Sequence, residues 1–327
     1  MPDSASAIAH PNIALVKYWG KRDVGLNLPS TGSLSLTLDT YRTATTVTWG
    51  APRERIVVNG RDVTGAEAAR VSRFLDRIAA DRPPCEVVTD NNFPIAAGLA
   101  SSSSGFAALA LAATAAAGQR REPAALSALA RLGSGSACRS LWGGWVVWER
   151  GVAADGSDSV GAPLAPRQHW DLRLVVAMVT GGRKSVGSTE GMLRTQETSP
   201  LYPGWVESAA EDLIRARHAV LDRDLAALGA VMEHSTLKMH ATMLSARLPI
   251  RYWKPSTLAV LDAVEELRQR GVMAFYTMDA GPNVKVLCQA ADADPVAAAL
   301  RGVTGEAVVL GVGGDPVVEG GVANRSV

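Results

Sequence analysis

The chain has 327 residues, of which 47% are hydrophobic and 20% charged, and its 33 Lys+Arg nearly balance its 32 Asp+Glu. This length predicts about two lobes. The composition excludes wholesale disorder, and the charge balance argues against a general nucleic-acid binder. Three widely spaced cysteines argue against a disulfide framework or a zinc site. Because neither a signal-peptide pattern nor an apolar run of about 20 residues is found, we expect a soluble cytoplasmic protein without a membrane segment.

The first half is predicted to mix strands and helices. Residues 1–8 are expected to form a loose leader. Residues rich in β-branched side chains predict strands at 42–49 and 55–59, with a turn at Asn59-Gly60 behind them. The remaining predicted elements are a helix at 64–80, a strand at 85–90, helices at 106–117 and 123–131, a strand at 144–150 and a loop at 151–163.

The second half begins with a continuous apolar run at 172–180, which is typical of a buried strand. A polar stretch follows. Beyond it we predict helices at 205–222 and 224–243, a helix from Pro255 to Gly271, two strands within 272–288, a helix after Pro295 and a strand at 307–312. Strands and helices interleave without strict alternation, which favours an α+β fold over a doubly wound sheet. The predicted lobes are residues 1–182 and 183–327, divided near Gly181-Gly182.

The segment PIAAGLASSSSG (94–105) lies between a predicted strand and a predicted helix. Glycine permits close backbone approach to a ligand, and the N–H groups of a helix N-terminus favour anions. A small-residue turn with serine N-caps would use the same residues. A phosphate-binding loop and an ordinary turn therefore both remain open, although the segment is not a Walker A motif.

The segment GSGSACRS (133–140) combines a Gly/Ser turn with Arg139 at the start of a predicted helix. A guanidinium would hold a carboxylate or phosphate by two parallel hydrogen bonds, which a lysine does less well. A serine-capped loop with a surface arginine competes with this interpretation. The Gly-x-Gly spacing is weak evidence for a dinucleotide site because the segment follows a helix rather than a strand.

Two further segments carry charged residues at strand ends. In HPNIALVKYWGKRD (10–23), alternation predicts a strand that brings Asn12 and Lys17 to one site, although a solvated basic turn is also compatible. In TMDAGPNVK (277–285), Asp279 ends an apolar strand and would serve either as a general base or as a turn residue. His234 and His240 lack the spacing of metal ligands on one helix face. The Ser235-x-x-Lys238 pattern lacks the companion motifs of penicillin-recognising enzymes.

Four segments in order resemble the diphosphomevalonate decarboxylases, members of the galactokinase, homoserine kinase, mevalonate kinase and phosphomevalonate kinase (GHMP) superfamily. The matching segments are HPNIALVKYWGKRD, NNFPIAAGLASSSSGFAALA, RLGSGSACRSLWGGWVVW and MDAGPNVKV. STGSLSLTLDT (30–40) and GSTEGMLRTQETSP (187–200) also look like this family. The similarity covers roughly residues 8–315, and four long matches in order are highly specific.

The resemblance implies a two-lobed GHMP-kinase fold around a deep cleft. Its N-terminal half would resemble ribosomal protein S5 domain 2, and its C-terminal half, carrying the catalytic aspartate, would be ferredoxin-like. It implies ATP and Mg²⁺ as cosubstrate and cofactor, and a homodimer is expected. The reaction would convert mevalonate 5-diphosphate to isopentenyl diphosphate in isoprenoid biosynthesis, with release of ADP, phosphate and carbon dioxide after phosphorylation of the 3-hydroxyl.

The resemblance also assigns roles to residues. The catalytic residues would be Asp279, Arg139, Lys17, Asn12 and Ser102. The substrate would contact Tyr18, Trp19, Lys21, Ser134, Gly135, Ser136, Met192 and Ala280. ATP would bind Pro94, Ala97, Gly98, Leu99, Ala100, Ser101, Ser102 and Ser103. The ligands of Mg²⁺ stay open, with Ser102 as a candidate.

Two departures from the family pattern keep alternatives open. Ser103 and Ser104 stand where the family's loop usually continues with alanine, or alanine and serine, and Thr189 stands where some bacterial members have a diphosphate-binding arginine. A phosphomevalonate decarboxylase or a mevalonate 3-kinase therefore remains the nearest alternative. A catalytically silent binding protein would be expected to have lost Asp279, Arg139 or the serine loop. A sugar or amino-acid kinase would not be expected to carry the 10–23 and 133–140 segments.

Overall fold

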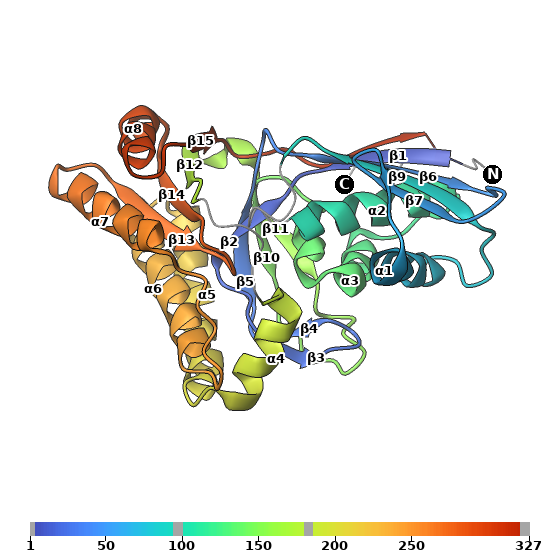
Figure 1. Ribbon diagram of the computed structural model, residues 1–327, viewed down its shortest axis with the longest axis horizontal. Coiled ribbons are helices and arrows are strands. Elements are labelled where there is room, and N and C mark those ends of the chain that lie inside the picture. The colour runs from blue at the N-terminus through green and yellow to red at the C-terminus, as the bar shows by residue number, and fades with distance from the viewer. Residues whose placement is uncertain (1–3, 94–100, 180–185, 321–327) are drawn as a thin grey trace.

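The computed structural model describes residues 4–93, 101–179 and 186–320. The described residues form three larger sheets, each built from strands that are not all consecutive in the chain, and helices pack on these sheets. This is an α+β fold, as predicted (Figure 1). Across Figure 1, a six-stranded sheet with its helices lies on one side, a four-stranded sheet lies in the middle, and a second four-stranded sheet with its helices lies on the other side.

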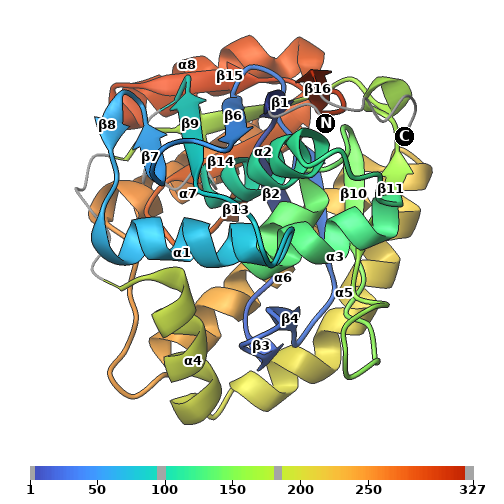
Figure 2. The same ribbon diagram turned by 90° about the vertical axis from the view of Figure 1, so that its right-hand side faces the viewer.

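The first sheet belongs mainly to the N-terminal half. In order across the sheet, its strands are β16 (Val317–Gly320), β1 (Ser4–Ala9), β6 (Thr43–Trp49), β9 (Cys85–Asn91), β7 (Arg55–Val58) and β8 (Arg61–Asp62). The helices beside it are α1 (Gly65–Asp76), α2 (Ser101–Ala116) and α3 (Pro123–Gly133) (Figure 2). Asn59 and Gly60 both have positive φ, 48° and 74°, which suits the tight hairpin that joins β7 to β8 and confirms the predicted turn.

The predicted loose leader is wrong for residues 4–8, because they form most of β1. Its alternating alanines, Ala5, Ala7 and Ala9, are at most 3% exposed and belong to the same core as the alanines of α2. Serine and alanine are weak strand formers, so the pattern gave no sequence signal of a strand. Their small side chains instead let an alanine-rich helix lie close to the sheet.

The second sheet lies in the middle of the molecule. Its strands, in order, are β11 (Gly161–Ala165), β10 (Trp145–Trp148), β5 (Ser33–Thr37) and β2 (Asn12–Val16), and a small hairpin of β3 (Lys21–Asp23) and β4 (Leu28–Pro29) follows β2. β11 begins inside the segment expected to be a loop at 151–163. The 133–140 segment forms a 3-10 helix, η1 (Gly135–Arg139), rather than the start of an α-helix.

The third sheet has helices on both faces. Its strands are β13 (Ala274–Met278), β14 (Val284–Gln289), β12 (Leu172–Ala177) and β15 (Ala307–Leu310). One face packs on α7 (Pro255–Gln269) and α8 (Ala293–Thr304), and the other on α5 (Tyr202–Leu221) and α6 (Leu225–Leu244). The hydrophobic core between the third sheet and α5 and α6 also contains residues of β2 and β5, so these two helices connect the middle sheet to the third.

The remaining elements are shorter. α4 (Ser188–Thr198) occupies the stretch that was expected only to be polar, and η2 (Arg167–His169) and η3 (Ala290–Asp292) are single turns. β16 comes from the end of the chain yet pairs with β1 in the first sheet. The predicted lobe boundary at 182/183 falls within 180–185, outside the described residues, and stays a prediction.

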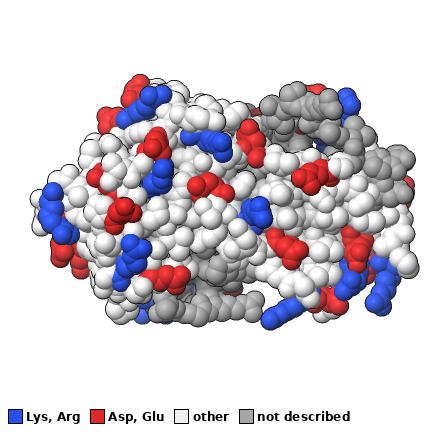
Figure 3. Space-filling model, turned by 90° about the horizontal axis from the view of Figure 1, so that it is seen from above, with Lys and Arg blue, Asp and Glu red and all other residues white. Residues whose placement is uncertain are grey.

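The charges on the surface and the character of the helices both agree with the composition of the chain. On the face seen in Figure 3, basic and acidic side chains are interspersed over both ends of the molecule. Among the described helices, none combines the length and apolar character needed to cross a bilayer.

Candidate active site

A cavity of about 1040 Å³ lies where the two halves meet. Its walls come from β2 and the segment after it, α1, the start of α2, η1, α4 and the loop after β13. The predicted site residues that line it are Asn12, Lys17, Tyr18, Trp19, Lys21, Ser101, Ser102, Ser134, Gly135, Ser136, Arg139, Met192, Asp279 and Ala280. Ser103 is fully buried and is not part of the cavity wall. Pro94, Ala97, Gly98, Leu99 and Ala100 lie outside the described residues.

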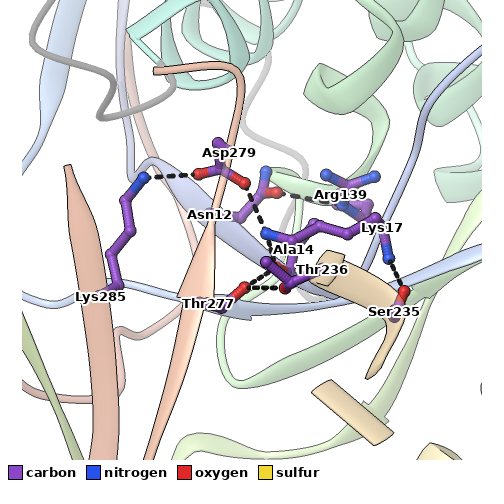
Figure 4. Close-up of polar contacts among 9 residues, drawn as sticks. All are labelled: Asn12, Ala14, Lys17, Arg139, Ser235, Thr236, Thr277, Asp279 and Lys285. Carbon is purple, nitrogen blue, oxygen red and sulfur yellow. Dashed lines mark hydrogen bonds and ion pairs between the residues drawn. The ribbon is translucent and has the colours of Figure 1, made fainter. Parts of the chain in front are cut away.

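Asp279 lines this cavity and is held by polar contacts from two lysines (Figure 4). It follows the last residue of β13, and its Oδ1 accepts a hydrogen bond from Lys17 Nζ at 2.8 Å. Lys17 Nζ also donates to the carbonyl oxygen of Ala14 at 2.7 Å, and its backbone N–H donates to Ser235 Oγ at 3.0 Å. On the other side, Lys285 Nζ donates to Asp279 Oδ2 at 2.9 Å. The carboxylate is therefore held between two ammonium groups.

Arg139 and Asn12 form the neighbouring part of the centre. Arg139 Nε donates to Asn12 Oδ1 at 3.0 Å, and another guanidinium nitrogen donates to Ser33 Oγ at 2.8 Å. The amide nitrogen of Asn12 donates to Ser140 Oγ at 2.7 Å and to the Ser136 carbonyl at 3.1 Å. Both residues are at most 2% exposed. These bonds fix one edge of the guanidinium while the residue still lines the cavity.

Burial and charge set the protonation of this centre. Burial opposes the charge on Asp279, but Lys17 and Lys285 outweigh it and hold the pKa of its carboxyl well below the usual range. Burial lowers the pKa of Lys17 to about 8, with Asp279 opposing this and Lys285 adding to it. Burial also lowers the pKa of Arg139, although an arginine stays charged in proteins. The centre thus presents three cations around one carboxylate.

At another part of the wall, Tyr18 approaches the η1 turn. A Cβ on Gly135 would lie 2.7 Å from the Tyr18 hydroxyl, so the close approach requires glycine there. The Tyr18 ring packs edge-on against Trp148, with ring centroids 4.7 Å apart. The Tyr18 hydroxyl and the Trp19 indole N–H are buried and have no hydrogen-bond partner within the described parts of the chain. Because burial raises the pKa of Tyr18, its hydroxyl keeps its proton and remains a donor.

Lys21 is held by residues that the sequence did not single out. Its Nζ donates to Asn27 Oδ1 at 2.6 Å, and the Asn27 amide donates to carbonyls at the end of α3. The Gln196 side chain of α4 bonds both the backbone N–H and the carbonyl of Lys21, each at 2.8 Å. α4 also lies against Trp19, since a Cβ on Gly191 would come within 3.1 Å of that ring. This helix therefore connects the C-terminal half to the Lys21 segment.

The start of α2 and one face of α1 border the same cavity. Ser102 Oγ accepts a hydrogen bond from Ser134 Oγ at 3.2 Å, which joins the serine segment to the η1 turn. Three exposed arginines of α1, Arg70, Arg73 and Arg77, line the cavity. They were not predicted from the sequence, because they belong to none of the family-like segments. Free N–H groups at a helix N-terminus together with arginines favour phosphate.

The described residues contain no group of three or more His, Cys, Asp and Glu side chains that would bind a metal by themselves. Mg²⁺ in phosphoryl-transfer sites is commonly held by substrate phosphates with one or two protein oxygens. Ser101 and Ser102, at the cavity wall beside the α2 N-terminus, supply oxygens of this kind. The residues present therefore fit a phosphate-borne magnesium ion.

Sequence reasoning missed Ser33, Ser235 and Lys285. Ser235 belonged to the dismissed Ser-x-x-Lys pattern, and it instead anchors the Lys17 backbone. Lys285 carried a usable signal, because it is a single charged residue in a strand whose first five residues are buried. Thr189, where some bacterial relatives were expected to have arginine, does line the cavity.

Comparison with known proteins agrees with this geometry. The "Diphosphomevalonate decarboxylase-like N-terminal domain" model matches residues 9–161, and the "Mevalonate 5-diphosphate decarboxylase C-terminal domain" model matches residues 174–309. A diphosphomevalonate decarboxylase from Candida albicans is 38% identical over 312 residues, which cover 90% of this chain and 86% of that protein.

Solved structures are similar over nearly the whole chain. A crystal structure of mevalonate diphosphate decarboxylase from Staphylococcus aureus superposes with a TM-score of 0.93 at 36% identity and covers 98% of both chains. The complex described as "MDDEF in complex with MVAPP, AMPPCP and Magnesium" gives a TM-score of 0.91 at 38% identity, covering 97% of this chain and 99% of that one.

The fold and the comparisons together define a two-lobed enzyme of the GHMP-kinase class, with a cavity lined by basic side chains between its halves. Within that class, the chain belongs to the diphosphomevalonate decarboxylase family.

Proposed function

We propose that this chain catalyses the ATP-dependent decarboxylation of mevalonate 5-diphosphate to isopentenyl diphosphate, with release of ADP, phosphate and carbon dioxide. One observation carries the proposal: Asp279 lies between lysines in the same cavity as the Arg139–Asn12 pair. Tyr18 and Ser102 line the same cavity. The substrate's tertiary hydroxyl would therefore lie at Asp279 and its carboxylate at Arg139, while the 5-diphosphate would lie at Tyr18 and the ATP phosphates at Ser102.

In the first step, Asp279 would orient the 3-hydroxyl and accept its proton as the hydroxyl oxygen forms a bond to the γ-phosphorus of ATP. The bond from that phosphorus to the β,γ-bridging oxygen would break, and its electron pair would leave with ADP. A free tertiary hydroxyl is a poor leaving group, whereas its phosphate ester leaves readily. Lys17 would offset negative charge between Asp279 and the phosphates. Positioned charges of this kind supply much of the catalysis in phosphoryl transfer.

In the second step, the carbon–oxygen bond would break with its electron pair on the departing phosphate. Because its pKa lies well below the usual range, Asp279 would pass the proton it accepted to a phosphate oxygen and, anionic again, would stabilise positive charge at that carbon. The bond to the carboxylate would then break, and its electron pair would form the double bond while carbon dioxide leaves. Arg139, with Asn12 beside it, would hold the carboxylate in position until this bond breaks.

The 5-diphosphate would bind at the η1 wall. The unpartnered Tyr18 hydroxyl supports this assignment, since a buried donor without a partner is costly until a ligand satisfies it. The proposed diphosphate and substrate contacts are Tyr18, Trp19, Lys21, Ser134, Gly135, Ser136, Met192 and Ala280.

ATP would bind at the start of α2. Ser101 and Ser102 line the cavity there, and Arg70, Arg73 and Arg77 border it from α1. The proposed loop contacts Pro94, Ala97, Gly98, Leu99 and Ala100 lie outside the described residues, and Ser103 would contribute through the helix rather than through its buried side chain. Mg²⁺, bound through the phosphates with Ser102 as the candidate protein ligand, would neutralise charge on the transferring group.

We further propose that the protein is a cytoplasmic homodimer with lobes at 1–182 and 183–327. Light scattering coupled to size-exclusion chromatography tests the dimer: a mass near twice 34.2 kDa is expected, and a monomeric mass at assay concentration would contradict it.

A two-substrate assay tests the activity. With ATP and Mg²⁺, ADP and carbon dioxide are measured together on mevalonate 5-diphosphate and, separately, on mevalonate 5-phosphate. The proposal predicts equal amounts of both products on the diphosphate and little of either on the monophosphate. Coupled products on the monophosphate would indicate a phosphomevalonate decarboxylase, and ADP without carbon dioxide would indicate a 3-kinase.

A further inference from the structure

Lys285 is a buried cation at a strand position that otherwise suits an apolar residue. It lies in β14 opposite Thr277 of β13, and its neighbours Val284, Val286 and Leu287 are fully buried. Its residue exposure is 0%, and it does not line the cavity. A lysine is rarely buried this completely unless it is paired with an opposite charge. The group with which Lys285 pairs therefore indicates why a lysine is present at this position.

Lys285 pairs with the carboxylate of Asp279, the proposed catalytic base. Lys285 Nζ lies 2.9 Å from Asp279 Oδ2, while Lys17 Nζ lies 2.8 Å from Oδ1 (Figure 4). The two lysine side chains are 1% exposed, but that of Asp279 is 27% exposed and reaches the cavity. Lys285 therefore contacts the carboxylate from outside the cavity, and any influence on the reaction passes through Asp279.

We propose that Lys285 is a positioning residue of the decarboxylase: it fixes Oδ2 of Asp279 from outside the cavity and keeps this carboxylate anionic and aimed at the substrate 3-hydroxyl. The inference rests on the proposed function and extends it, because the sequence pattern assigned no role to this lysine. A carboxylate with one oxygen held by Lys17 alone would still rotate about its last bond. Two opposed ammonium groups remove that freedom.

The charges around Asp279 give the inference a measurable consequence. The groups that face it are Lys17 from the end of β2, Lys285 from β14, Arg139 from η1 and His240 from α6. Burial lowers the pKa of His240 to about 3, so this ring is neutral at assay pH. Lys285 lowers the pKa of Asp279 and also that of Lys17. Removing the Lys285 charge must therefore raise both pKa values.

The test compares Lys285→Met with Lys285→Arg in pH profiles of kcat/KM. For Lys285→Met we expect kcat to fall about tenfold or more with KM changed less than threefold, as for loss of an interaction that acts in the transition state. Its basic limb, set by Lys17, should move to higher pH by at least about half a unit, because a neighbouring cation is lost. Lys285→Arg keeps the charge and should leave the basic limb in place.

Lys238→Met is the matched control. Lys238 pairs with the buried Asp212 at 2.6 Å and lies outside the cavity wall, so its loss should lower the melting temperature without moving the basic limb. An unmoved limb in Lys285→Met, or unchanged kcat, would overturn the inference. If neither Lys285→Met nor Lys285→Gln folds while Lys238→Met does, Lys285 is a scaffold residue and the inference is again overturned. Failure of the proposed function is distinguishable, because then the unmodified chain itself would release no carbon dioxide.

Discussion

Two parts of the cavity wall differ in how completely their polar groups are hydrogen-bonded: the reaction centre around Asp279 and the proposed diphosphate end, the open end, around Tyr18 and Trp19. At the reaction centre, Asp279, Lys17, Arg139 and Asn12 already bond one another or their supports. At the proposed diphosphate end, the Tyr18 hydroxyl and the Trp19 N–H have no partner within the described residues. The protein thus fixes the groups that would act on charge developing in the transition state, and leaves donors free where a ligand would supply the acceptors.

This difference predicts which kinetic constant a mutation changes in each part of the cavity. Changes at the fixed centre should lower kcat, because they disturb groups that are prepared before the substrate arrives. Changes at the open end should raise KM, because they remove bonds that form on binding and persist through the reaction.

The largest effect is expected for Asp279→Asn. The amide cannot accept the hydroxyl proton or supply negative charge, so kcat should fall about 10²-fold or more while calorimetry still detects ATP and substrate binding. Asp212→Asn is the matched control, since it also removes a buried carboxylate paired with a lysine. Near-normal turnover of Asp279→Asn would contradict the assignment of Asp279 as the catalytic base.

Arg139→Lys should be the next most damaging change. Lysine keeps the charge but cannot bond Asn12 and Ser33 as the guanidinium does, and a buried acceptor left unpaired costs about 1–3 kcal/mol. We expect kcat/KM to fall roughly 10- to 100-fold, mostly through kcat. Arg82→Lys, at a buried arginine outside the cavity wall, controls for loss of a guanidinium as such. Equal losses in the two variants would contradict a local role.

The pH profile of kcat/KM should show that activity requires the charged form of Lys17. Lys17 carries its proton below its pKa of about 8 and loses it above that value, so its ion pair with Asp279 is present at lower pH and lost at higher pH. We expect kcat/KM to fall on the alkaline side with an apparent pKa near 8, by roughly tenfold per pH unit beyond it. A flat profile up to pH 9.5, with folding verified by circular dichroism, would contradict a requirement for the Lys17 ammonium.

The smallest predicted effect is at the open end. Tyr18→Phe removes one hydroxyl and keeps the ring on Trp148, so KM for mevalonate 5-diphosphate should rise several-fold to about tenfold, the value of one ordinary hydrogen bond, with kcat within about threefold. Tyr41→Phe, away from the cavity, should change neither constant. If Tyr18→Phe lowered kcat instead, the distinction between the two ends would fail.

Long periodic segments of the fold were predictable, and short ones were not. The apolar patterns located α5, α6 and β12 because each buries a broad face within a contiguous segment. β1 was missed because alternating Ser and Ala carry little strand signal. α4 was missed because only Gly191, Met192 and Thr195 are buried in its mostly polar sequence. Such elements are decided by what they pack against, which the local sequence does not contain.

The same division holds for the site. The four family-like segments brought Asn12, Lys17, Arg139 and Asp279 into the prediction, and all four line one cavity. Ser33 and Ser235 were missed because serine in a strand or helix is common and their partners are distant in sequence. Lys285 was missed because its significance depends on strand pairing, which brings β14 alongside β13 and its ammonium to Oδ2 of Asp279.

The central claim is that the 3-hydroxyl is phosphorylated and then leaves as phosphate while the carboxylate departs. The most direct test uses mevalonate 5-diphosphate carrying ¹⁸O in the 3-hydroxyl, with unlabelled ATP and Mg²⁺, and mass spectrometry of the inorganic phosphate. We expect one ¹⁸O atom in phosphate for each carbon dioxide released. Carbon dioxide released with unlabelled phosphate would show that the hydroxyl oxygen leaves by another route, and would contradict the role of Asp279 derived from its position.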